Sequence, residues 1–305
     1  MSEAAAANVA QRLAPQSNPP HWGASSETAL LTDVLLSAPA HLAMIPCNAV
    51  TVANLAQGLL TCPIDAVRQH RAFAATLEQA GVRCHFVSPR EGMPDLCFTR
   101  DSVLMTPWGL VQLRPSAPHR RDESSHVAAA ALAFGVPPYA RIEEGTVEGG
   151  DVCLLREGLV VIGHSGDRTN QAGAEALGAL FEERGWEVIH TRFDPRYLHL
   201  DTIMAMVADD CAVVFPDALE GSLLARLGGL GIRLVAATAE EVRHLSANFV
   251  SLGGGRVLAA RGSERLAAML EKRGVEVIDV ALDQFTRCGG GPHCLTMPLA
   301  RLPAA

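Results

Sequence analysis

The sequence predicts an α/β fold in which about five similar units close into a propeller-like disc. A strand, turn, strand, helix, strand order recurs at roughly fifty-residue spacing, and the first and last expected strands each lack a partner. An ordinary open α/β sheet is the alternative, and the repeats alone do not decide between the two.

The clearest unit occupies residues 152–189. Apolar runs at 152–155 and 159–163 predict two strands around a tight Glu157-Gly158 turn, followed by a helix at 170–184 and a strand at 186–189. A second copy of this order predicts strands 249–252 and 256–260, helix 263–272 and strand 275–280. The first strands of successive units are expected to begin near Leu96, Val152, Thr202, Ala247 and Cys294.

The two ends of the ordered chain supply the argument for closure. The first expected strand, residues 29–36, precedes a helix at 64–80, and the last unit stops after a strand at 294–299. Pairing these two strands would complete a ring and remove the exposed sheet edges that an open array presents.

Composition bounds the number of domains. A hydrophobic content of 49% over 305 residues is enough for a substantial core, and we expect a single catalytic domain at 27–305. Residues 1–26 are rich in Ala, Ser, Pro and Gln and lack hydrophobic periodicity, so they are expected to form a flexible tail.

Charge and hydropathy exclude several classes of partner. The net charge is -8, the sequence pI is near 5.8, and no lysine or arginine cluster is long enough to follow a phosphate backbone, so no nucleic-acid partner is expected. No run approaches the roughly 18 apolar residues of a membrane span, and no secretory signal precedes the domain. We therefore expect no membrane association and a cytoplasmic location.

Eight cysteines lie scattered through the chain without the paired C-x-x-C spacing of zinc or iron–sulfur sites. Most are expected to be reduced core residues. Neither a metal nor a cofactor is expected.

Polar residues recur at the same phase of successive units, just before or on each first strand. In a closed disc these positions face one axis, so their side chains would gather in a single acidic pit with one histidine and one cysteine for chemistry. The residues are Asp95, Asp101, Glu148, Asp151, His199, Asp201, Asn248, His293 and Cys294.

Such a pit suits a planar cation. A guanidinium presents five N–H donors in a fixed fork, which paired carboxylates satisfy in bidentate fashion. A thiolate could attack the central carbon, while an imidazole protonates the departing amine and later takes a proton from the attacking water. The three glycines before Pro292 would allow a close approach of the ligand to the backbone.

Structural roles compete with each of these assignments. Cys294 could be a small buried hydrophobe, and His199 could be a core histidine on a strand at 197–201. Glu148 and Asp151 could flank a solvated turn, Asp101 could pair with Arg100 or Arg121, and Arg168 could only decorate a helix start. Three other histidines are interpreted as bystanders, namely His119, His164 and His293.

Five motifs in order resemble those of the guanidino-modifying (pentein) superfamily, which includes arginine deiminase, dimethylarginine dimethylaminohydrolase and the amidinotransferases. They are PDLCFTRD at 94–101, EGGD at 148–151, RTN at 168–170, HLDT at 199–202 and GGGPHC at 289–294. The resemblance spans roughly residues 96–299 and implies a five-bladed α/β propeller of ββαβ units around a pseudo-fivefold axis.

The resemblance also implies roles for single residues. Cys294 would be the nucleophile, and His199 with Glu148 would handle protons. Substrate binding would fall to a further set, in which two carboxylates grip the guanidinium, an arginine holds the substrate carboxylate, and an acid and an aromatic ring lie nearby. Asp101 and Asp201 would grip the guanidinium, and Arg168 would hold the substrate carboxylate. Asp95 and Phe98 are the nearby acid and aromatic ring.

The expected partner is a small guanidino compound, with the homo-oligomeric state left open. Hydrolysis of arginine or an Nω-substituted arginine ranks first, because amidinotransferases are generally longer chains. Transfer of the amidino group to an amine is the runner-up, and a non-catalytic propeller that binds a partner is a remote third.

Overall fold

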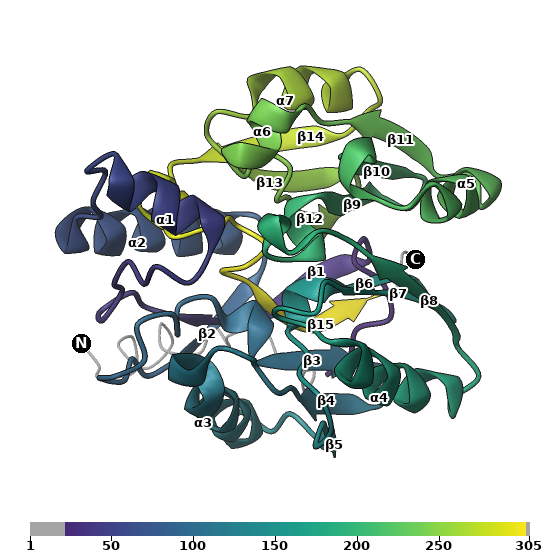
Figure 1. The fold of residues 1–305 in the computed structure, drawn as a ribbon, viewed down its shortest axis with the longest axis horizontal. Coiled ribbons are helices and arrows are strands. Elements are labelled where there is room, and N and C mark those ends of the chain that lie inside the picture. Colours follow the sequence, from purple (N-terminus) through teal and green to yellow (C-terminus); the bar gives the residue numbers. More distant parts are fainter. Residues whose placement is uncertain (1–21, 303–305) are drawn as a thin grey trace, which may run out of the picture.

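The computed structural model describes residues 22–302 and shows a mixed α/β fold of five three-stranded sheets, an arrangement that fits five blades (Figure 1). In each sheet the middle strand pairs antiparallel with one neighbour and parallel with the other. The sheets are β3 (Val103–Thr106), β4 (Gly109–Gln112), β5 (Pro138–Arg141); β6 (Val152–Arg156), β7 (Leu159–His164), β8 (Glu187–Arg192); β9 (Met204–Ala208), β10 (Cys211–Val214), β11 (Arg233–Ala236); β12 (Val250–Gly253), β13 (Arg256–Ala260), β14 (Glu276–Val280); and β15 (Met297–Leu302), β1 (Leu30–Ser37), β2 (Arg83–Val87).

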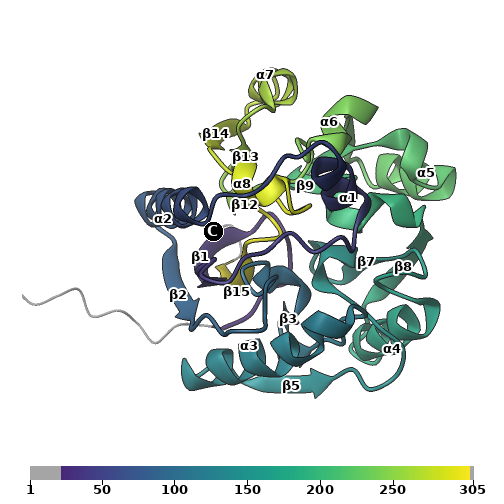
Figure 2. The same cartoon turned by 60° about the vertical axis from the view of Figure 1, so that its left-hand side comes forward.

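A helix connects each pair of parallel strands and lies on the outside of the sheets, as both views show (Figures 1 and 2). Parallel strands need such a crossover, which explains the recurring order in the sequence. These helices are α2 (Pro63–Gln79), α3 (Arg121–Ala133), α4 (Gln171–Glu182), α5 (Gly221–Gly229) and α7 (Glu264–Glu271); the remaining helices are α1 (Ala49–Ala56), α6 (Ala239–Arg243) and α8 (Asp283–Thr286).

Helix α4 illustrates how the sequence specifies one unit. Asn170 caps it by accepting a hydrogen bond from the backbone N–H of Gly173 at 2.9 Å. Its buried face is apolar and spaced three to four residues apart, with Ala174, Leu177 and Phe181 fully buried against the β6–β8 sheet. The predicted helix, residues 170–184, is thus correct apart from its last turn.

The expected pairing of the first and last strands is confirmed. β1 runs antiparallel to β15, from Leu30 opposite Leu302 to Leu35 opposite Met297. Neighbouring sheets also touch through their first strands: β9 contacts β6 and β12, β12 contacts β1, and β15 contacts β3. The two ends of the described chain therefore meet in one sheet, and strand contacts of this kind link all five sheets.

The predicted tail extends too far. Residues 1–21 lie outside the described residues, but residues 22–26 pack against β15: Gly23 N donates to Leu299 O at 3.0 Å, and Arg301 N donates to Gly23 O at 2.8 Å. Ala24 is buried in the core. These backbone bonds make residues 22–26 part of the described fold rather than of a tail.

Four of the five first strands begin later than predicted. Only the strand at Val152 starts where expected; the others start at Val103, Met204, Val250 and Met297. Irregular segments precede these strands, with 3₁₀ turns at Thr99–Asp101 and Leu200–Thr202, and hold the polar residues that the sequence suggested lay just before or on the strands.

The segment around His199 shows the same difference. Residues 197–201 do not form a strand, because His199 is an extended residue between two 3₁₀ turns, Pro195–Tyr197 and Leu200–Thr202. The preceding Leu198 has a φ of 53°, a left-handed conformation that turns the chain sharply at this point. None of the helices formed by residues 22–302 combines the length and the apolar character that a membrane crossing requires.

Candidate active site

Three 3₁₀ turns meet at the centre of the site: Thr99–Asp101, Gly149–Asp151 and Leu200–Thr202. The two glycines of the middle turn make the close approach possible. A Cβ on Gly149 would overlap the carbonyl of Arg100, and a Cβ on Gly150 would lie 2.8 Å from the ring of His199. The turns can therefore lie in contact only because these positions lack side chains.

A pocket opens in front of these turns and measures about 330 Å³, with open solvent included. Cys294 and His199 both line it, as the sequence predicted, although they lie 95 residues apart in the chain (294 − 199 = 95). Other predicted site residues that line it are Asp95, Phe98, Asp101 and Arg168, joined by Cys47, Asn48, Arg120, Leu198, Cys288, Gly289 and Gly290.

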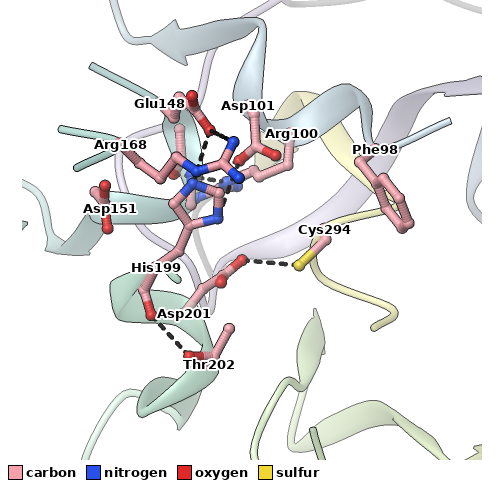
Figure 3. A network of polar contacts seen from close by, with 12 residues as sticks. Phe98, Arg100, Asp101, Glu148, Asp151, Arg168, His199, Asp201, Thr202 and Cys294 are labelled. Carbon is pink, nitrogen blue, oxygen red and sulfur yellow. Dashed lines mark hydrogen bonds and ion pairs between the residues drawn. The ribbon is translucent and has the colours of Figure 1, made fainter. Parts of the chain in front are cut away.

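His199 and Glu148 form a buried pair. Nε2 of His199 lies 2.8 Å from Oε2 of Glu148, whose other oxygen accepts a hydrogen bond from Ser116 N at 3.0 Å (Figure 3). Burial lowers the pKa of His199, but the carboxylates of Asp101, Asp151 and Glu148 outweigh it and raise that pKa to about 10. His199 is therefore a cation at neutral pH.

Glu148 is fully buried behind the imidazole and does not line the pocket. Burial raises its pKa, but the hydrogen bond and charge of His199, with the nearby Arg168, lower it well below the usual range. Glu148 therefore stays ionised and fixes the orientation of His199.

Asp101 is held by an arginine that the sequence did not single out. Nη1 of Arg120 donates to Oδ2 of Asp101 at 2.6 Å, and Gly150 N donates to Oδ1 at 3.1 Å. Neither Arg100 nor Arg121 is the partner of Asp101. Arg120 is itself buried and also donates to Glu123 at 2.8 Å, so the Asp101 carboxylate is fixed at the wall of the pocket.

The sulfur of Cys294 lies at the other side of the site, 2% exposed. It donates to Oδ2 of Asp201 at 3.4 Å (Figure 3). It also accepts from Nδ2 of Asn248 at 3.4 Å. Burial, followed by the charges of Asp201 and Asp101, raises the pKa of Cys294 well above that of an ordinary thiol. In the free protein the sulfur is therefore a neutral thiol at pH 7.

Asp201 departs from its expected place. It touches the sulfur of Cys294, but it lines a second, inner cavity of about 300 Å³ rather than the pocket that holds His199. Its Oδ1 has no hydrogen-bond partner among the described residues, and its Oδ2 also bonds His293. His293, which the sequence suggested was a bystander, therefore contacts a predicted site residue.

Arg168 does more than begin a helix, since Asn170 caps α4. Its Nη2 donates to the carbonyl of Cys47 at 2.7 Å, and its Nη1 lies 3.8 Å from Oε2 of Glu148. The guanidinium therefore ties the segment before α1 to the site and faces the pocket. Nε2 of His119, also interpreted from the sequence as a bystander, lies 2.7 Å from Oδ2 of Asp95.

Three residues of this region escaped the sequence analysis: Glu27, Arg120 and Cys47. None of the three lies at the recurring position just before a first strand. Their place in the repeat therefore did not mark them as site residues. Glu27 and Arg120 are buried charged side chains, which only the folded structure reveals.

Two groups of side chains have the types and spacing of metal ligands, with their ligand atoms within 4.8 Å of one another. They are Asp101, Glu148 and His199, and Cys47, Asp95 and His119. In both groups the histidine is already bonded to a carboxylate of the same group, His199 to Glu148 and His119 to Asp95.

Comparison with known proteins agrees with this geometry. The family model described as "N,N dimethylarginine dimethylhydrolase, eukaryotic" matches residues 52–301. The chain is 30% identical over 257 residues to the N(G),N(G)-dimethylarginine dimethylaminohydrolase of Streptomyces coelicolor, covering 82% of this chain and 94% of that one. It is 29% identical to an arginine deiminase of Mycolicibacterium gilvum, over 69% of this chain but only 61% of the deiminase.

Among solved structures, the N-terminal domain of ArgZ, an arginine dihydrolase from cyanobacteria, superposes with a TM-score of 0.79 at 21% identity, over 89% of this chain and 99% of that one. That likeness concerns the fold alone. Since the family model covers most of the sequence, the chain belongs to the N,N dimethylarginine dimethylhydrolase family, among the amidine-hydrolysing enzymes of the guanidino-modifying superfamily.

Proposed function

We propose that this protein hydrolyses the guanidino group of arginine or an Nω-substituted arginine, with Cys294 as nucleophile and His199 as proton carrier. The products are ammonia or an alkylamine and a ureido compound such as citrulline. One observation carries the proposal: a buried thiol and a cationic imidazole line a single pocket whose wall includes the fixed carboxylate of Asp101. The hydrolases of dimethylarginine and arginine among its relatives support this substrate class.

The pocket offers complementary groups for both ends of such a substrate. Asp101, and Asp201 through its Oδ1, which is unpartnered within the described chain, would accept N–H donors of the guanidinium. Arg168 would pair with the substrate carboxylate, and Asp95 with its amino group. Phe98, whose ring packs over Gly290, would cover the aliphatic stem.

In the first half-reaction the Cys294 thiolate attacks the guanidinium carbon and forms a C–S bond. His199 donates its proton to the departing nitrogen, the C–N bond breaks, and a thiouronium remains on the sulfur. The bound cation lies beside Asp101 and Asp201, so it offsets the two charges that keep the free thiol protonated. Substrate binding therefore favours the thiolate at the moment it is needed.

In the second half-reaction neutral His199 takes a proton from water as the oxygen attacks the thiouronium carbon. The C–S bond then breaks, the proton of the new hydroxyl passes to the departing sulfur and restores the neutral thiol, and the ureido product leaves. Glu148 keeps the imidazole oriented through both steps, because its carboxylate bonds Nε2 of His199.

Several coarser features follow from the same proposal. The five sheets would surround a pseudo-fivefold axis as a propeller, with the folded chain from residue 22 onward acting as one catalytic domain. Contacts between the first strands of neighbouring sheets support this arrangement.

The test is a panel of arginine, methylarginines and other guanidino acids, with mass-resolved products, each assayed with and without an added amine. We expect ureido product without the amine. Product that forms only when the amine is present, and carries the amidino group on it, would replace hydrolysis with amidino transfer. No turnover of any member would contradict both.

A further inference from the structure

A chain of buried charged groups lies behind the nucleophile. Nδ1 of His293 lies 2.8 Å from Oδ2 of Asp201, and Nε2 of His293 lies 3.4 Å from Oε2 of Glu27. The other oxygen of Glu27 accepts a hydrogen bond from Arg100. All four side chains are nine-tenths or more buried, and the carboxylate of Asp201 ends the chain against the sulfur of Cys294.

The members of this chain come from distant parts of the sequence. Glu27 precedes β1 and lies 266 residues from His293, while Arg100 belongs to the first 3₁₀ turn. Burying several ionisable groups costs more than packing apolar side chains of the same volume. A cluster that only stabilised the fold would not need buried charges, so these charges are expected to serve the thiol of Cys294 at the end of the chain of groups.

We propose that His293 and Glu27 are positioning residues for the reaction at Cys294, an inference that rests on the proposed function. His293 holds the carboxylate of Asp201 beside the sulfur, and Glu27 fixes the ring of His293 from its far side. His293 thereby acts through Asp201 and touches neither substrate nor sulfur.

The inner cavity explains why Asp201 needs such support. Glu27, Asp201 and His293 all line this space of about 300 Å³, together with Cys153 and Phe249. Because Asp201 lines this space, packing on that side does not by itself prevent rotation of its carboxylate away from Cys294. The hydrogen bond from His293 opposes that rotation, while Oδ1, which has no partner among residues 22–302, remains available to the substrate.

Charge balance gives His293 a second effect. The carboxylates that face Cys294 are Asp201 and Asp101, and the charged groups that face His293 are Glu27, Asp201 and Arg100. A protonated His293 offsets the charge of Asp201, which otherwise opposes a thiolate. Loss of the imidazole should therefore raise the pH at which Cys294 ionises.

Two substitutions distinguish the hydrogen bond that His293 donates from the space that its side chain fills. His293→Leu removes the N–H donor, whereas His293→Asn keeps a donor at the place of Nδ1. His70→Leu is the matched control, because His70 is a buried histidine on α2 whose Nε2 has no partner in the described chain. The pH dependence of Cys294 alkylation by iodoacetamide is read from its peptide by mass spectrometry, and kcat is measured on the best substrate of the panel.

For His293→Leu we expect a kcat about a hundredfold lower and a Cys294 alkylation profile displaced to higher pH. His293→Asn should recover most of the loss, and His70→Leu should match the wild type. A folded His293→Leu whose kcat and alkylation profile both equal those of the wild type overturns the proposal.

If His293→Leu does not fold, Glu27→Gln replaces it, since the amide keeps an acceptor for His293 but removes the charge. An unchanged alkylation profile in that variant also overturns the proposal. Failure of the proposed function gives a different result: the wild type turns over no guanidino compound, while the alkylation profiles still report on His293.

Discussion

Cys294 and His199 share the carboxylates around them, and this raises the pKa of both groups. At Cys294 burial is the main cause, and the charges of Asp201 and Asp101 add to it. At His199 burial lowers the pKa, but Asp101, Asp151 and Glu148 outweigh it. The reactive pair, thiolate and imidazolium, is therefore the minor form of the free protein at neutral pH.

This arrangement fixes the sign of the pH dependence. Because the Cys294 pKa lies above its usual range and the His199 pKa is about 10, raising the pH forms thiolate while the imidazole keeps its proton. We expect kcat/KM to rise between about pH 6.5 and pH 8.5, by up to roughly tenfold per unit. Steady-state kinetics in buffers of constant ionic strength measure this, and a flat or falling profile would contradict it.

The buried carboxylate of Asp151 lowers the stability of the folded protein at neutral and higher pH. Its Oδ1 accepts from Leu200 N at 2.8 Å, but its Oδ2 has no partner in the described chain. Burial, offset in part by His199, raises its pKa to about 7. The folded state therefore holds this proton more tightly than the unfolded state, and stability falls as the pH rises from about 4 to 7.

Asp151→Asn should accordingly stabilise the protein at pH 8, by on the order of 2–4 kcal/mol, and much less at pH 5, where the native carboxyl is already protonated. Urea unfolding at the two pH values measures the difference. Asp217→Asn, at an exposed position, is the control and should change neither value. An equal effect of Asp151→Asn at both pH values would contradict the assignment of a buried charge.

At the scale of elements, the 3₁₀ turns rather than the strands present the chemistry. Gly149 and Gly150 let the middle turn lie against its neighbours, and each turn delivers one acid or base to the site. Strands and helices supply the frame, whose apolar periodicity is regular and therefore readable in the sequence.

Gly150→Ala tests the role of the turns. Its Cβ would lie 2.8 Å from the ring of His199, which must then move from Glu148. We expect kcat to fall about a hundredfold, since a displacement of roughly 1 Å suffices for such a loss. Gly228→Ala, with open space around its Cβ on the exposed face of α5, should leave kcat unchanged. Equal kcat values for the two variants would show that close packing of the turns is unimportant.

The regular strands and helices could be predicted from the sequence, whereas the irregular turns could not. The helix at 64–80 and the strands at 256–260 and 29–36 were predicted within one residue, because their periodic apolar faces are local signals. The pairing of the first and last strands followed from two expected strands without partners. The starts of the first strands were misplaced because turns such as Leu200–Thr202 have no hydrophobic period to mark them.

The site could be predicted only in part for a related reason. Residues at one phase of the repeat, such as Cys294 and His199, converge on one pocket as expected. Arg120 and Glu27 come from other phases, so nothing in their local sequence separates them from exposed charges. The direction of Asp201, toward the inner cavity, depends on His293 and is likewise a property of the assembled structure.

At the scale of the whole molecule, strand β15 joins the two ends of the described chain and directly follows the segment that carries the nucleophile. Cys294 lies three residues before β15 (297 − 294 = 3), and β15 pairs with β1 and contacts β3. The last residues of the fold thereby link the first sheet to the rest and hold Cys294 in position.

Deleting residues 297–305 should therefore abolish cooperative unfolding and activity together, because β1 loses its antiparallel partner and the edge contacts to β3 disappear. Deleting 303–305 alone leaves β15 intact and should preserve both. Thermal unfolding followed by circular dichroism measures the transitions. A chain that still unfolds cooperatively without 297–305 would show that the ring does not depend on this strand.

The most direct test of the central claim is capture of the covalent intermediate. The protein is mixed with its best substrate, quenched in acid within the first turnovers and digested. The mass of each cysteine-containing peptide is then measured by mass spectrometry. A thiouronium adduct should appear on the peptide that contains Cys294, on none of the other seven cysteine positions, and not at all in Cys294→Ser, which should also lose turnover. Ureido product formed at the wild-type rate by Cys294→Ser, or an adduct on a different cysteine, would contradict it.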